Sequence, residues 1–242
     1  MSFLDSVVSG VITRPRKIGV YGEHGVGKTY WSVKKFPKPI VIAVEDGTSD
    51  LDCARIPTEV LTSSRAVMGA VDECSESDFQ TIVVDSVDWF ENLIAADLDK
   101  EGFDCSFGKG PVEVARRFGA FLGLLDKCTK AGKTVILIAH QEIRQATDIN
   151  GNNWDQIRPK LSKRACELLM EWCDEVLLAK REDYVRKEDG AFGKKNTVAT
   201  TTGRRILKTS THPSYMAKAR LDLPSEIDMN SDVSIFLTGA KE

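Results

Sequence analysis

One short segment constrains the fold of this 242-residue chain more than any other part of its sequence. It consists of Gly22, Glu23, His24, Gly25, Val26, Gly27, Lys28 and Thr29. The segment fits the pattern G-x-x-x-x-G-K-[ST] at every constrained position, between the strand-like run KIGVY and a helical pattern. This strand–loop–helix order is what a phosphate-binding P-loop requires, whereas the alternative is a glycine-rich turn that happens to end in Lys-Thr.

The residue types of this segment suit a nucleoside triphosphate. Glycines let backbone N–H groups turn towards phosphates, and the N-terminus of the following helix adds positive potential. Lys28 supplies a point charge for the β- and γ-phosphates, and the Thr29 hydroxyl is a ligand for Mg²⁺. We therefore predict that ATP and Mg²⁺ bind here, with Tyr30, the next residue, also contributing to the site.

Length and composition favour a single α/β domain. Of the residues, 42% are hydrophobic and 29% are charged, which is enough for one sizeable core. No apolar run approaches the roughly 20 residues of a membrane-spanning helix, and the N-terminus lacks a secretory signal. Six cysteines without a C-x-x-C pair favour free thiols over a zinc site. We therefore expect a cytoplasmic protein without membrane contact.

Apolar, strand-like runs alternate with longer helical patterns, as in a parallel sheet with helical crossovers. The runs IVIAV, TIVVD and TVILIA are continuously apolar, so both faces of those strands should be covered. We predict strands at residues 17–21, 39–44, 81–85, 134–139 and 175–180. We predict helices at residues 29–36, 65–74, 87–100, 112–131 and 162–173, and loops at 101–111 and 144–159.

Polar side chains end three of these strands, at the edge where open α/β sheets bind ligands. Asp85 ends TIVVD and is predicted to hold Mg²⁺, a role compatible with capping the next helix. Glu45 follows the second strand and could deprotonate a water in line with the γ-phosphate, or could be a solvated loop acid. Gln141, with His140 before it, ends the fourth strand as a γ-phosphate sensor or simply as a polar strand end.

The order of these parts resembles the core of RecA-type recombinases over residues 16–224. It is most similar to phage-encoded, RecA-like P-loop ATPases of the single-strand annealing group, an AAA-type family. The segments that carry the resemblance are 43–47 (AVEDG), 82–87 (IVVDSV) and 139–141 (AHQ). The resemblance implies a RecA-like core with a mostly parallel central sheet flanked by helices, followed by a C-terminal β-hairpin region. It also implies that Glu45 is the catalytic base and Gln141 the sensor.

Two further implications concern assembly. In RecA-like proteins a K-x-[KR] segment followed by proline reaches the nucleotide of the neighbouring protomer, and residues 218–224 (KARLDLP) have this form. The resemblance thus implies that Lys218 and Arg220 act in trans in a homo-oligomer, a filament or a ring, unless they are a surface basic pair. We expect residues 1–16 to be a short N-terminal segment that contributes an oligomerisation contact, 17–224 to be the core and 225–242 to be a tail.

A basic stretch follows the fourth strand. Residues 141–220 hold 16 Lys or Arg against 11 Asp or Glu, whereas the rest of the chain holds 17 against 25. Cations with an exposed aromatic side chain are typical of a sequence-independent single-strand site, although a solvated face and a loop anchor are the alternatives. The predicted single-stranded DNA contacts are Arg144, Trp154, Arg158, Lys160, Lys163 and Arg164. A second basic group is interpreted as a solvated face: Lys194, Lys195, Arg204, Arg205 and Lys208.

Together these features predict a Mg²⁺-dependent, DNA-stimulated and slow ATPase. We expect it to assemble on single-stranded DNA and to promote annealing in phage recombination, in the host cytoplasm and alongside a single-strand-binding protein. One alternative is a hexameric helicase-type or packaging-type motor on the same core. The other is a non-hydrolysing, ATP-gated module that binds DNA or loads a partner.

Overall fold

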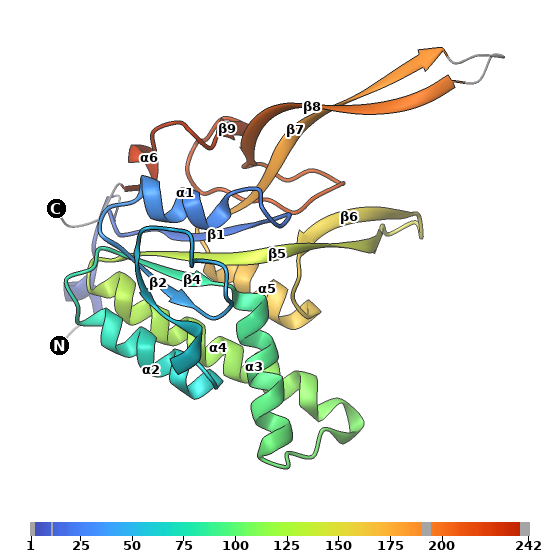
Figure 1. Cartoon of the computed structure of the whole chain (residues 1–242). Coiled ribbons are helices and arrows are strands. Elements are labelled where there is room, and N and C mark those ends of the chain that lie inside the picture. The colour runs from blue at the N-terminus through green and yellow to red at the C-terminus, as the bar shows by residue number, and fades with distance from the viewer. Residues whose placement is uncertain (1–2, 11, 190–194, 238–242) are drawn as a thin grey trace.

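A computed structural model describes residues 3–10, 12–189 and 195–237 of the chain (Figure 1). One mixed sheet has the strand order β3-β2-β4-β5-β1-β7-β8-β9, and β6 pairs with β5. The strands are β1 (Lys17–Gly22), β2 (Pro39–Ala43), β3 (Ala54–Ile56), β4 (Thr81–Asp85), β5 (Thr134–Thr147), β6 (Asn153–Pro159), β7 (Glu175–Asp189), β8 (Lys195–Lys208) and β9 (Glu226–Asp228).

Helices cover both faces of this sheet (Figure 1). They are α1 (Lys28–Lys35), α2 (Ser64–Ser75), α3 (Val87–Lys100), α4 (Lys109–Lys130), α5 (Lys163–Trp172) and α6 (Ser234–Leu237), with short 3₁₀ turns η1 (Phe3–Ser6), η2 (Thr58–Val60) and η3 (Ser106–Gly108). One core lies between the sheet and α2, α3, α4 and α5, and a second lies between the sheet and α1 and α6.

Six neighbouring strands are mutually parallel: β3, β2, β4, β5, β1 and β7. Strand β8 is antiparallel to β7, and β9 is antiparallel to β8. The strands β2, β4 and the first half of β5 are buried nearly throughout, as their continuously apolar sequences predict. The strand order places β5 between the P-loop strand β1 and the Asp85 strand β4. The predicted α/β class is confirmed, with a mostly parallel central sheet flanked by helices and a C-terminal β-hairpin.

The predicted loop at residues 144–159 is wrong. Strand β5 continues to Thr147 and pairs antiparallel with β6, so that the segment is a β-hairpin. Only its tip is a turn, where the Asp148 carboxylate accepts hydrogen bonds from the N–H groups of Asn150 and Asn152. The strands on either side of the tip are polar and partly exposed, so they lack the apolar run that identifies a buried strand. The glycine and asparagine of the tip therefore led to the prediction of a loop.

The predicted loop at residues 101–111 is shorter than expected. Helix α4 begins at Lys109, with Gly108 preceding it in the left-handed region at φ 77°. Phe107 lies within η3 and is fully exposed. Helix α4 then buries Phe118, Phe121 and Leu125, which recur every three to four residues and so share one face of the helix.

Part of the expected C-terminal tail packs into the core. Strand β9 pairs with β8, and Phe236 of α6 is completely buried. Its ring lies 6.0 Å from that of Trp31 and 6.5 Å from that of Phe36, measured between centroids. Among the described residues, no helix has the length and apolar character needed to cross a membrane.

Candidate functional site

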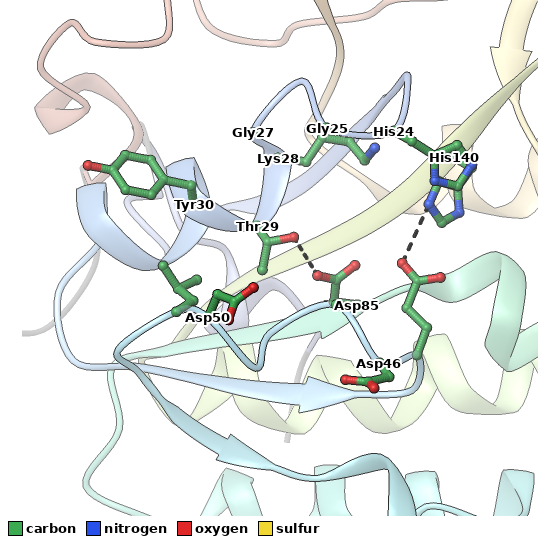
Figure 2. A pocket seen from close by; sticks show the side chains of 13 residues that line it. His24, Gly25, Gly27, Lys28, Thr29, Tyr30, Asp46, Asp50, Asp85 and His140 are labelled. Carbon is green, nitrogen blue, oxygen red and sulfur yellow. Dashed lines mark hydrogen bonds and ion pairs between the residues drawn. The ribbon is translucent and has the colours of Figure 1, made fainter.

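A cavity of about 420 Å³ opens at the carboxyl edge of the parallel strands (Figure 2). Six of the nine residues predicted to bind nucleotide line it, together with the loop that follows β2, the end of β4 and the middle of β5. The lining residues are His24, Gly25, Gly27, Lys28, Thr29, Tyr30, Glu45, Asp46, Gly47, Asp50, Leu51, Asp85 and His140. The other three predicted residues, Gly22, Glu23 and Val26, belong to the same loop but do not line the cavity.

Two glycines are required by the shape of the loop between β1 and α1. A Cβ atom on Gly22 would collide with the carbonyl oxygen of Ala179 on the neighbouring strand β7. Gly27 precedes the first helical residue of α1 with φ 97°, a left-handed conformation that side chains strongly disfavour. The backbone therefore turns sharply enough for the first N–H groups of α1 to face the cavity.

The Lys28 side chain is held across this loop. Its Nζ atom donates hydrogen bonds to the carbonyl oxygens of Gly22 at 3.0 Å and Glu23 at 2.9 Å. Burial lowers the pKa of the ammonium group, and the nearby carboxylates of Asp85 and Glu45 oppose that shift. A partly desolvated cation at the floor of a cavity interacts strongly with an anion that enters it.

Thr29 and Asp85, the residues predicted to hold Mg²⁺, lie in direct contact. The Thr29 hydroxyl donates to Asp85 Oδ2 at 2.6 Å, and the Asp85 side chain is almost fully buried. Burial raises the pKa of this carboxyl group. A buried carboxylate beside a hydroxyl oxygen, open to a cavity that can admit phosphate, fits the all-oxygen ligand set of Mg²⁺. The residue that precedes helix α3 as its N-cap is Ser86, so Asp85 does not have the alternative capping role.

Glu45 and His140 face each other across the cavity. Glu45 Oε1 lies 3.4 Å from His140 Nε2, and burial raises the pKa of Glu45 to about 7 although His140 opposes that shift. The His140 ring is oriented by Asp88, whose Oδ2 lies 2.9 Å from Nδ1. A hydrogen bond with Asp88 raises the pKa of His140. A carboxyl group with a pKa near neutrality, held beside an oriented imidazole, is well suited to proton transfer.

Two features of this cluster were not predicted from the sequence: the participation of Asp88, and the contact between His24 and His140. Asp88 lies in the first turn of α3 and bonds both the ring and the backbone N–H of His140. His24 stacks on His140 with ring centroids 3.9 Å apart, and His140 lowers its pKa. A signal for Asp88 existed, since it lies three residues after Asp85 at the start of a helix. None pointed to the stacking of His24, because it depends on the position of β5.

Gln141, the predicted sensor, lies at the rim of the site. Its side chain does not line the cavity, and its Nε2 atom is 3.4 Å from Glu23 Oε1. The neighbouring His140 faces the cavity instead. The assignment of Gln141 as sensor therefore stays a prediction, now with a specific contact to the P-loop.

Comparison with protein families identifies the core. A family model described as an AAA domain, AAA_24, matches residues 14–221. The chain belongs to this AAA domain family. The match covers the P-loop, Glu45, Asp85 and His140, and the chain is a nucleotide-binding AAA-type ATPase by fold. Among curated proteins none matches this AAA domain.

Three solved structures are similar to this AAA domain at low identity. The RadB recombinase is 17% identical, with a TM-score of 0.43 over 85% of this chain and 93% of that one. The flagellar accessory protein FlaH of Methanocaldococcus jannaschii is 12% identical, with a TM-score of 0.39 over 85% and 90%. An ATPase of the type III secretion system of pathogenic bacteria is 11% identical, with a TM-score of 0.42 over 69% and 51%. At these identities, function has to be argued from the residues of this chain.

Lys218 and Arg220 lie away from the nucleotide cavity of their own AAA domain. Lys218 pairs with Val176 near the start of β7, at the opposite edge of the sheet from the P-loop. Its Nζ atom donates to the carbonyl oxygens at the end of α5, including that of Cys173 at 2.7 Å. Arg220 Nη1 lies 3.0 Å from Asp174 Oδ1. Action on a neighbouring protomer stays a prediction for both residues.

The predicted DNA-binding residues gather along the β5–β6 hairpin and the start of α5. Arg144 and Arg158 both approach the Glu142 carboxylate, at 2.8 and 3.5 Å, and the Trp154 indole N–H donates to the Pro213 carbonyl oxygen at 2.7 Å. Trp154 is therefore partly anchored rather than free. The remaining three residues are exposed and form no ion pair with the side chains that the structure describes: Lys160, Lys163 and Arg164.

The second basic group is not a uniform solvated face. Arg205 of β8 is half-buried, and its guanidinium carbon lies 5.8 Å from the centroid of the Tyr30 ring. Arg204 bonds Glu182 and Asp228, and Lys208 pairs with Glu226. Lys194 lies outside the described residues. The solvated-face interpretation is therefore wrong for Arg205. Side chains alternate between the two faces of β8, and that of Arg205 lies on the face towards α1.

Proposed function

We propose that this AAA domain is a Mg²⁺-dependent ATPase that assembles on single-stranded DNA and promotes its annealing in phage recombination. The observation that carries the proposal is the continuity of β5, which runs from the catalytic cavity into a basic hairpin. Its residue His140 faces Glu45, the next residue, Gln141, contacts the P-loop, and Arg144 lies three residues further along. One strand thus links the phosphate site to a surface suited to nucleic acid.

Hydrolysis would depend on groups already close together. Glu45, with its pKa raised to about 7, accepts a proton from an attacking water, and the oriented imidazole of His140 lies beside it. Lys28 and the N–H groups at the start of α1 bind the phosphates. Thr29 and Asp85 would hold Mg²⁺, which would supply positive charge to offset the negative charge of the phosphates. This set of groups supports an ATPase over a module that only binds nucleotide.

The hairpins support a nucleic-acid surface beside the P-loop. Both β5 and β7 are parallel to β1 and continue past the register of Gly22, so the β5–β6 and β7–β8 hairpins extend beyond the edge that carries the P-loop (Figure 1). Exposed cations at Lys160, Lys163 and Arg164 would follow a phosphate backbone and would make binding depend strongly on salt. A site of this kind reads no base sequence, as annealing of arbitrary strands requires.

Assembly would place a second protomer against the first. Lys218 and Arg220 lie at the edge of the sheet opposite the P-loop. In a head-to-tail assembly, this edge of one protomer would face the P-loop edge of the next. In such a filament or ring they would complete the neighbour's nucleotide site. A single-strand-binding protein in the host cytoplasm would then be the natural competitor or partner on DNA.

The test is ATP hydrolysis across a protein-concentration series, with and without single-stranded DNA. We expect DNA to stimulate turnover, and the stimulation to rise cooperatively with protein concentration. Flat, DNA-independent turnover would contradict the DNA-coupled mechanism. Directional unwinding of a duplex would indicate a motor instead, and full annealing by a Glu45→Gln variant would indicate a non-hydrolysing, ATP-gated module.

A further inference from the structure

Two arginines face each other at the base of the β7–β8 hairpin. Arg181 of β7 and Arg205 of β8 are direct cross-strand partners in the ladder. Because side chains alternate along a strand, Arg205 points to the same face as Leu207, which packs in the core beneath α1. Arg204 points to the other face, where Glu182 and Asp228 approach its guanidinium group to 3.4 and 3.3 Å.

Both arginines of this cross-strand pair reach the P-loop. Arg181 Nη2 donates to the Gly25 carbonyl oxygen at 3.4 Å. Arg205 lies against Gly27, since a Cβ atom built on that glycine would be only 2.5 Å from Arg205 Nη1. Its guanidinium group also lies over the ring of Tyr30. Gly25, Gly27 and Tyr30 all line the nucleotide cavity, so the two guanidinium groups lie directly beside its wall.

The surroundings of Arg205 differ from those of Arg204. It is half-buried, yet among the side chains that the structure describes no Asp or Glu forms an ion pair with it. Its neighbour Arg204, which is more exposed, has two carboxylates close to it. A partly desolvated guanidinium group with no counter-charge is costly unless an anion binds to it, and its planar donor groups match phosphate oxygens well.

The sheet order indicates which part of a nucleotide these arginines would meet. Asp85 and Glu45 follow β4 and β2, which lie on one side of β1, whereas β7 and β8 lie on the other side. The γ-phosphate and its cation belong beside Asp85, Thr29 and Glu45. A nucleotide that extends from there along the P-loop therefore turns its α- and β-phosphates and its sugar towards β7 and β8.

We propose that Arg205, supported by Arg181, binds the α- or β-phosphate of nucleoside di- and triphosphates in its own protomer. The inference rests on the nucleotide site described above but does not depend on DNA binding or on annealing. The contact serves ADP as well as ATP, because it lies on the side of the P-loop away from the γ-phosphate. It also ties the base of the β7–β8 hairpin to the occupied nucleotide site.

The test is calorimetric titration of the full chain with Mg·ATP and with Mg·ADP, in the absence of DNA. We expect Arg205→Gln to raise both dissociation constants by about tenfold or more, the loss expected for one charge-assisted hydrogen bond. Arg204→Gln, the matched control on the other face of the strand, should change both constants by less than about twofold, because exposed ion pairs contribute little. The unfolding midpoint of Arg205→Gln without nucleotide should equal that of the wild type.

Several outcomes would overturn the assignment. Unchanged constants in Arg205→Gln, or a loss confined to ATP, would exclude a contact with the α- or β-phosphate. A lowered unfolding midpoint that accounts for the weaker binding would show that Arg205 only supports the P-loop. A Lys28→Ala variant tests the nucleotide site separately from the Arg205 contact. Full nucleotide binding by Lys28→Ala would refute the nucleotide site itself. Loss of binding in Lys28→Ala but not in Arg205→Gln would refute the arginine contact alone.

Discussion

The Thr29 hydroxyl and the Asp85 carboxylate lie 2.6 Å apart although 56 positions separate them in the chain. Thr29 is the last residue of the P-loop segment and lies in the first turn of α1, and Asp85 ends β4, two strands away from β1. Their meeting depends on β5, which lies between β1 and β4 and sets the separation of the two strand ends. The pair places a hydroxyl and a carboxylate oxygen side by side where we propose that the nucleotide's cation binds.

An Asp85→Asn variant should need more Mg²⁺ for turnover. Because the substitution removes the negative charge beside the Thr29 hydroxyl, the apparent affinity for Mg²⁺ should fall on the order of 10–100-fold. Titration of ATP turnover with Mg²⁺ at saturating ATP measures the effect. Asp46→Asn is the control, since Asp46 lines the same cavity but its carboxylate bonds Ser49. An unchanged Mg²⁺ requirement in Asp85→Asn would contradict the assignment.

A Glu45→Gln variant should bind ATP but hydrolyse it slowly. The amide cannot accept a proton from water, so we expect kcat to fall on the order of 10²–10⁴-fold, as for loss of a general base. Single-turnover hydrolysis and equilibrium binding of ATP separate the two effects. Equal losses in binding and turnover would instead indicate that Glu45 supports the shape of the site.

A triple substitution to glutamine at Lys160, Lys163 and Arg164 should weaken binding of single-stranded DNA and reduce its salt dependence. Each lost phosphate contact removes about 0.7 from the slope of log affinity against log salt, so the slope should become shallower by about 2. Fluorescence anisotropy with a labelled oligonucleotide across a salt series measures this slope. The matched control is the same substitution at three exposed lysines elsewhere, Lys34, Lys100 and Lys130. Equal slopes in both variants and the wild type would contradict the proposed surface.

Stability should depend on pH through Glu175, which is buried at the start of β7 beside Arg16. Burial raises its pKa from 4.5 to about 7, although Arg16 opposes that shift. A raised pKa in the folded state means that the stabilising contribution is complete below pH 4.5 and is lost as the pH rises through 7. In the wild type, the unfolding free energy should therefore fall between pH 5 and pH 8. The Glu175→Gln variant should show a smaller fall, by on the order of 1–3 kcal/mol.

Chemical denaturation at the two pH values measures that difference. Glu171→Gln is the control, because Glu171 is an exposed residue of α5 and should leave the pH dependence unchanged. If Glu175→Gln kept the full pH dependence of the wild type, another buried group would have to account for it.

Phe236→Ala should destabilise the whole core, since α6 packs on α1 through this ring. Truncation of a completely buried phenylalanine typically costs about 3–5 kcal/mol. Phe107→Ala removes the same side chain where it is fully exposed, and should change the unfolding free energy by less than about 0.5 kcal/mol. Similar small effects for both variants would show that α6 is detached in solution.

Most of the central sheet could be predicted from the sequence, because a strand buried on both faces leaves a continuous apolar run. The run TIVVD became β4 and the P-loop segment became the turn between β1 and α1, as expected. The β5–β6 hairpin could not be predicted in this way. Its strands extend beyond the core into solvent, so no apolar pattern marks them, and the asparagines and glycine of the tip dominated the composition.

The nucleotide site could also be predicted from the sequence, because the P-loop glycines, Lys28 and Thr29 belong to one continuous segment. The contacts that residues from distant parts of the chain make in this site were decided by the tertiary structure. Asp88 orients His140, and Arg205 lies against Gly27, only because strand pairing brings β5 beside β4 and folds β8 back over the P-loop. Strand order and register are set by packing over long sequence separations, and no short motif encodes them.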